Sequence, residues 1–162
     1  MTTDAPDHRA DGPEGAARGA GRHALPAEIE ASLASYERGA TALRAACAGL
    51  PPALANRRIG PGEWSIQEVA THLLDSDLAS THRMRRIVAE SDPLLVSYDE
   101  NAFIARLPSE RLELGEILAA FEANRRFTAR WLRTLAPADF ARTGIHTQRG
   151  KVTLAEIEPL RR

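Results

Sequence analysis

The 162-residue sequence has one cysteine, few aromatic residues and almost no net charge, and each scarcity excludes a class of protein. Cys47 alone cannot form an intrachain disulfide, which favours a reducing compartment over secretion. A formal net charge of −1, with acidic and basic residues interspersed, provides no electrostatic attraction to nucleic acid. The sequence has no signal peptide and no apolar run of the roughly 20 residues that span a membrane. We therefore expect a soluble, cytoplasmic protein without a nucleic-acid or membrane partner.

The remaining composition predicts one domain preceded by a tail. Residues 1–24 lack periodicity and large apolar side chains, so burial cannot offset their ordering entropy, and we expect this tail to be disordered. His8 and His23 lie in it and are interpreted as solvated rather than metal-binding. Residues 25–162 form the expected domain, and a hydrophobic content of 43% is sufficient for a core.

The first long helix is predicted from Pro26 to Leu50, before Pro51-Pro52. Cys47 lies on its apolar stripe, where a small buried hydrophobe is a commoner role than a reactive thiol. The stripe repeats at four-three spacing through Ile29, Leu33, Tyr36, Ala40, Leu43, Cys47 and Leu50.

The central helix follows Trp64 within residues 62–88, and Ser65 with Glu68 forms a capping box at its start. His72 lies at the flank of its apolar seam, about 100° from the centre, which predicts that the imidazole faces a groove between helices. The predicted seam is Ile66, Ala70, Leu73, Asp77, Ser80, Met84 and Ile87.

A short helix capped by Asp99 and a third long helix opening at Pro108-Ser109 are expected next. Asn124 and Thr128 interrupt the apolar stripe of that third helix, at the depth of Asp77. Because buried polar groups need partners, we expect an internal polar patch, with Arg125 or Arg126 as the partner of Asp77. The predicted stripe is Leu114, Ile117, Phe121, Asn124, Thr128, Trp131 and Leu135.

The C-terminal residues predict a helix that begins and then stops. The segment RTGIHTQRGK is typical of a polar turn, and Thr153 with Glu156 makes a second capping box. Leu154 and Ile157 start an apolar face, but Pro159 and the end of the sequence follow.

Four segments in this order resemble the DinB-like superfamily, which includes bacillithiol or mycothiol S-transferases and proteins described as metal-dependent hydrolases. They are WSIQEVATHLLD, DPLLVSYDE, FEANRRFTARWLRTL and GIHTQRGKVTLAEI, and together they cover roughly residues 28–158. The resemblance implies an all-α fold, an up-down-down-up helical bundle. This chain would supply three long helices, a short extra helix and an incomplete fourth bundle helix.

The resemblance also implies a divalent metal, zinc or nickel, held by three histidines. One matches His72, but the His-x-x-x-His pair of the fourth helix has no counterpart, and His146 falls in the preceding turn and is not carried over as a ligand. One imidazole leaves most of a coordination shell to water, so we expect weak metal binding or none. Asp75, one turn after His72, is an alternative oxygen ligand or, more commonly, a solvated carboxylate.

Loss of a fourth helix would expose an apolar groove larger than soluble monomers tolerate. There are three alternatives: a partner such as a second copy covers the groove, the protein is marginally stable, or the chain is a truncated copy. We favour the last of these.

Two functions follow. The first is an enzyme-derived bundle of the metal-dependent thiol S-transferase or hydrolase type, with a small thiol as substrate and without an intact metal site. The second is a non-catalytic helical module that associates through its groove. A DNA-binding regulator is disfavoured by the charge.

Overall fold

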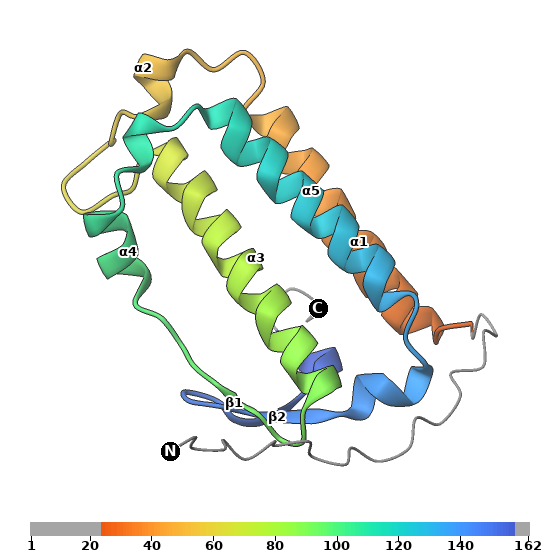
Figure 1. Ribbon diagram of the computed structural model, residues 1–162. Helices are drawn as coiled ribbons and strands as arrows, with labels where there is room; N and C mark the ends of the chain where they lie inside the picture. The colour runs from red at the N-terminus through yellow and green to blue at the C-terminus, as the bar shows by residue number, and fades with distance from the viewer. Residues whose placement is uncertain (1–23, 158–162) are drawn as a thin grey trace, which may run out of the picture.

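The computed structural model describes residues 24–157, and its three long helices form the body of the molecule (Figure 1). They are α1 (Ala27–Ala46), α3 (Ile66–Ala89) and α5 (Leu114–Leu132). Helix α5 packs against both α1 and α3. Two shorter helices, α2 (Pro52–Ala55) and α4 (Glu100–Arg106), lie in the connections on either side of α3. The described chain is therefore a helical bundle, as the sequence predicts.

A small sheet closes the bundle at the C-terminal end of α3 (Figure 1). Its strands are β1 (Leu94–Leu95), β2 (Thr143–His146) and β3 (Gly150–Thr153), in the order β1-β2-β3. β1 pairs parallel to β2 and β2 pairs antiparallel to β3. Gly144 lets the hairpin approach α3, because an added Cβ would lie 2.9 Å from Leu95 and 3.1 Å from Ile87. The segment interpreted from sequence as a polar turn is thus a β-hairpin.

The core has two parts along the length of the helices. Near the sheet, Leu33, Met84, Leu132 and Leu154 are completely buried in one cluster. At the other end, Cys47, Ala70, Ile117 and Leu118 form the second cluster, so Cys47 is the small buried side chain that its stripe predicts. The short 3-10 turn η3 (Leu154–Glu156) places Leu154 and Ile157 in the first cluster.

Two details of the helix predictions are wrong, and the Gln67 side chain lies at both places. Ile66 is 43% exposed, whereas Gln67 is 2% exposed. The Gln67 amide nitrogen donates to the carbonyls of Ser109 and Leu112, at 2.6 and 2.7 Å. The Ser109 carbonyl also accepts from the backbone N–H of Leu112 at 3.0 Å, which closes a single tight turn. The third helix therefore does not open at Pro108-Ser109; a 3-10 turn, η1 (Ser109–Arg111), comes first, and α5 starts at Leu114.

Some predictions fall on residues outside the described range. The tail, with His8 and His23, lies outside it apart from Ala24, and so does everything after Ile157. The last described helical turn is a third 3-10 turn, preceded by Thr153, whose backbone N–H donates to the Glu156 carboxylate at 2.9 Å. Within residues 24–157, no helix is both long and apolar enough to cross a bilayer.

Candidate functional site

His72 lies near the start of α3, two turns after a fully formed cap. The Ser65 hydroxyl accepts from the backbone N–H of Glu68, and the Glu68 carboxylate accepts from that of Ser65. The His72 ring packs against Trp64, with ring centroids 5.0 Å apart at an angle of 58°. Its Nε2 is 3.5 Å from Oε2 of Glu100, the first residue of α4, and its side chain is only 21% exposed. The imidazole therefore faces a sheltered junction between elements, consistent with the groove that its flank position predicts.

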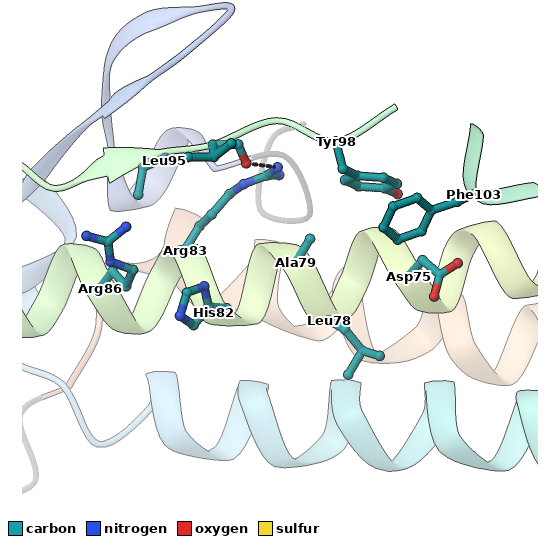
Figure 2. Close-up of a pocket in the computed structure, with 10 residues that line it drawn as sticks. Asp75, Leu78, Ala79, His82, Arg83, Arg86, Leu95, Tyr98 and Phe103 are labelled. Atoms are coloured by element: carbon teal, nitrogen blue, oxygen red, sulfur yellow. Dashed lines mark hydrogen bonds between the residues drawn. The ribbon is translucent and has the colours of Figure 1, made fainter. Parts of the chain in front are cut away.

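One turn further along α3, Asp75 opens a pocket of about 390 Å³ (Figure 2). The other wall is formed by the segment that joins β1 to α4 and by α4 itself, where the rings of Tyr98 and Phe103 pack at a tilt with centroids 4.6 Å apart. Burial raises the pKa of Asp75, and the neighbouring His72 partly counteracts this effect. Asp75 is therefore half-buried rather than freely solvated. His82, also on α3, is exposed and lines this pocket.

Side chains of α3 hold that segment in place. Arg83 donates to the carbonyl of Val96 at 2.7 Å, and Arg86 donates to that of Leu94 at 2.6 Å. The hydroxyls of Ser76 and Tyr98 are 2.6 Å apart. These contacts run along α3 and end at Tyr98, two residues before Glu100, which lies next to His72.

His146 lies in the sheet, away from His72. It is the last residue of β2, pairs with Leu95 across the sheet and is 8% exposed. The backbone N–H of Gln148 donates to its Nδ1 at 3.3 Å, a contact within the hairpin. The sheet packs on Ile87, which is fifteen residues beyond His72 on α3, or about 22 Å along the helix axis. His146 thus has a role in the hairpin and does not meet His72.

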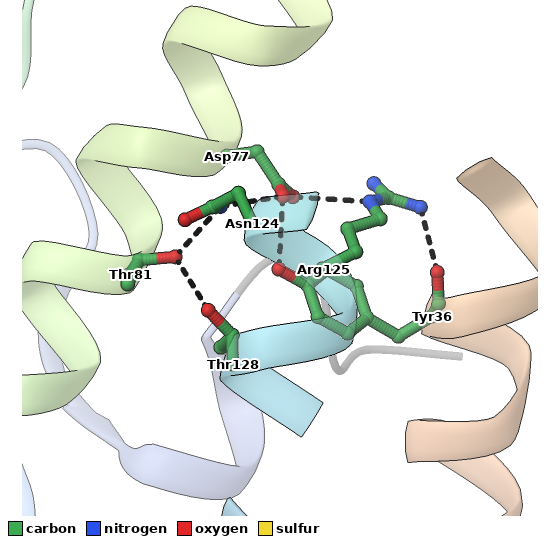
Figure 3. Close-up of polar contacts among 6 residues, drawn as sticks. All are labelled: Tyr36, Asp77, Thr81, Asn124, Arg125 and Thr128. Atoms are coloured by element: carbon green, nitrogen blue, oxygen red, sulfur yellow. Dashed lines mark hydrogen bonds and ion pairs between the residues drawn. The ribbon is translucent and has the colours of Figure 1, made fainter. Parts of the chain in front are cut away.

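The polar patch predicted inside the bundle is present and joins all three long helices (Figure 3). The Asp77 carboxylate accepts from the Tyr36 hydroxyl at 2.9 Å, from the Asn124 amide at 2.9 Å and from Nε of Arg125 at 3.2 Å. Thr81 and Thr128 extend the network, with their hydroxyls 3.1 Å apart. Arg125, and not Arg126, is the partner of Asp77. Tyr36 was missed because its place on the α1 stripe makes it count as an apolar residue.

Burial is the main influence on titration in this patch. It raises the pKa of Asp77, against the lowering effects of Arg125, Asn124 and Tyr36. Burial and the Asp77 carboxylate together raise the pKa of Tyr36, so the phenol keeps its proton. Among residues 24–157, no buried side-chain nitrogen or oxygen lacks a hydrogen-bond partner, which is the pattern of a structural polar core.

The donor set around His72 does not fit a complete metal centre. In residues 24–157, no three His, Cys, Asp or Glu side chains are placed to hold one metal ion. His72 and Glu100 form a pair only. Zinc sites in proteins use three or four protein ligands. A metal bound here by the described residues alone would therefore leave most of its coordination shell to water.

Several known proteins resemble the chain. A protein from Oceanobacillus iheyensis named "Putative metal-dependent hydrolase" is 30% identical over 95 residues, which are 59% of this chain and 55% of the relative. A protein of the same name from Bacillus mycoides is 29% identical over 94 residues, 58% of this chain and 54% of the relative. The aligned region thus spans about half the length of these curated relatives.

The fold has a solved counterpart. The structure of YfiT from Bacillus subtilis, described as "a probable metal-dependent hydrolase with an unusual four-helix bundle topology", superimposes with a TM-score of 0.73. The match covers 83% of this chain and 78% of YfiT, at 24% sequence identity, and shows that the two share a fold. The model of the DinB superfamily matches residues 35–157. The chain belongs to the DinB superfamily.

Proposed function

We propose that this protein derives from metal-dependent enzymes of the hydrolase or thiol S-transferase type, and that this chain contributes one imidazole, His72, to a metal site it does not complete. The names of the curated relatives support the metal-dependent class. The observation that carries the proposal is the position of His72, sheltered beside Trp64 and Glu100 without a third ligand among residues 24–157.

The consequence is weak binding of a divalent cation by the isolated chain. Among residues 24–157, no third protein ligand joins His72 and Glu100, so the binding free energy that these residues provide is far below that of a closed zinc site. A small thiol is the proposed substrate class, because S-transfer is the chemistry that the family resemblance implies. A second chain could supply the remaining ligands, so stronger metal binding should accompany association.

Isothermal titration of the purified chain with Zn²⁺ and with Ni²⁺ tests the proposal. We expect weak binding, with a dissociation constant above about 10 µM, and its loss in His72→Ala. His82→Ala is the matched control, since His82 is an exposed histidine on the same helix. Tight binding at one metal per chain would contradict the incomplete site, and binding unaffected by His72→Ala would contradict the role of His72.

The second candidate is a non-catalytic helical module that associates with a second copy of itself. Ile66 and Val69, on adjacent turns of α3, are 43% and 40% exposed, and they favour this function. Sedimentation velocity distinguishes the candidates. A metal-free dimer that dissociates in Ile66→Ser with Val69→Ser supports the module, whereas a monomer at all concentrations excludes it.

A further inference from the structure

A second groove lies between α3 and α5 and shares no residue with the pocket beside Tyr98. It encloses about 660 Å³, within the range of roughly 300–1,000 Å³ typical of small-molecule sites. Its lining contains no acidic side chain. The lining includes Arg85 of α3 and Arg126, Phe127, Arg130 and Trp131 of α5.

The three arginines of this groove have no acidic partner among residues 24–157. Glu122 is one turn before Arg126, but its carboxylate pairs instead with Arg44 of α1 at 2.9 Å. The other arginines nearby on α5 differ: Arg125 pairs with Asp77, and Arg133 pairs with Glu30 and Glu37. Arg126 and Arg130 are one turn apart, where like charges repel and weaken a helix. A chain of net charge −1 thus concentrates unneutralised positive charge at one place.

Aromatic rings accompany these charges. Phe127 is 58% exposed, although it lies on a well-packed helix. Trp131 is half-buried, and the Arg85 guanidinium carbon lies 5.3 Å from its ring centroid. Phe127 and Trp131 are one turn apart, and both line the groove. Neither the exposed ring nor the unpaired guanidinium groups contribute to the core of the bundle.

We propose that this groove binds a small phosphate monoester with a flat apolar body. Guanidinium groups bind phosphate oxygens through paired, charge-assisted hydrogen bonds, and a phosphate dianion can accept from more than one of them. Arg126 and Arg130 are about 6 Å apart along the helix axis, so one phosphate can contact both. Phe127 and Trp131 then offer faces for the apolar body. This site is independent of His72 and of the proposed metal chemistry.

The probe is 1-naphthyl phosphate, titrated into the full chain by calorimetry. We expect one saturable site, with binding at least about tenfold weaker in Arg126→Gln with Arg130→Gln, which removes both phosphate contacts. Arg38→Gln with Arg57→Gln is the matched control, because it removes two exposed arginines elsewhere and leaves binding unchanged. Phe127→Ser should weaken naphthyl phosphate but not inorganic phosphate, which lacks the ring. Circular dichroism verifies that each variant is folded.

Four results would overturn the proposal. The first is no saturable binding of 1-naphthyl phosphate by the wild-type chain up to about 10 mM. The second is an equal loss in the control pair, which would mean that overall charge and not this groove attracts the probe. The third is binding of 1-naphthol as tight as that of its phosphate. A chain that ignores the probe but binds a single-stranded oligonucleotide or an acidic peptide through Arg126 and Arg130 would also refute a small-molecule site.

Discussion

Replacing Arg125 with methionine tests the buried network by removing its cation. The Asp77 side chain is 1% exposed and that of Arg125 is 17% exposed, so the ion pair lies almost wholly inside the bundle. Arg125 also donates to the carbonyl of Tyr36 at 3.0 Å, and its guanidinium carbon lies 4.2 Å from the centroid of Phe121. Methionine retains an unbranched apolar stem for Phe121 but removes the charge and the donors.

The expected cost depends on pH. Removing one partner of a buried ion pair costs about 3–5 kcal/mol, because the other charge stays buried. Burial already raises the pKa of Asp77 above its usual value of 3.8, and Arg125 is the main influence that lowers it. The folded state therefore binds this proton more tightly than the unfolded state, so the stability gained by protonation is lost as pH rises through the folded pKa. Without Arg125 that pKa rises further, and the loss of stability should be larger at about pH 8 than at about pH 5.

Urea unfolding followed by circular dichroism at both pH values measures the effect. Arg126→Met is the matched control, since Arg126 is the neighbouring arginine without an ion pair in the described part of the chain, and it should change stability by less than about 0.5 kcal/mol. Adding Asp77→Asn to Arg125→Met should recover part of the loss and remove its pH dependence. A loss below about 1 kcal/mol, or one equal at both pH values, would refute the reasoning.

Three further substitutions test the packing around these elements. Gly39→Ala should destabilise the fold by about 1–3 kcal/mol, because the added Cβ would collide with the guanidinium of Arg125. Gly115→Ala has open space around the added Cβ and should stabilise the fold by about 0.5 kcal/mol. Thermal unfolding compares the two variants. Gln67→Ala should cost about 1–3 kcal/mol in urea unfolding, because it removes a buried amide that bonds to the carbonyls of Ser109 and Leu112, and a neutral result would contradict the assigned bonds. Arg126→Gln should stabilise by about 0.2–0.5 kcal/mol at low salt and by less at high salt, since it relieves repulsion from Arg130; a loss of stability would count against unpaired charge there.

The helices and the polar patch are predictable from sequence because their signals are local or periodic. The box formed by Ser65 and Glu68 fixes the start of α3, and the spacing of Leu33, Tyr36 and Ala40 fixes the buried face of α1. Asn124 interrupts an apolar stripe, and that interruption by itself indicates a polar partner on a facing helix, which is Asp77.

The sheet, the burial of Gln67 and the approach of Glu100 to His72 depend on contacts between segments that are distant in sequence. β1 and β2 are two and four residues long and pair across about fifty residues of chain, so no local alternation reveals them. Gln67 is polar in sequence and buried in the structure because its partners come from the turn before α5. Glu100 is distant from His72 in sequence and lies next to it in the structure, where Arg83 and Arg86 bond to the segment that precedes α4.

Histidine NMR during a zinc titration tests most directly whether His72 is the one ligand of an incomplete site. We expect the signals of the His72 ring to shift progressively in fast exchange and to approach saturation only at a large excess of Zn²⁺, while those of His82 and His146 remain unchanged. A new set of His72 signals in slow exchange, complete at one equivalent, would reveal a closed site. Shifts at His146 or His82 with His72 unmoved would contradict the assignment of the ligand.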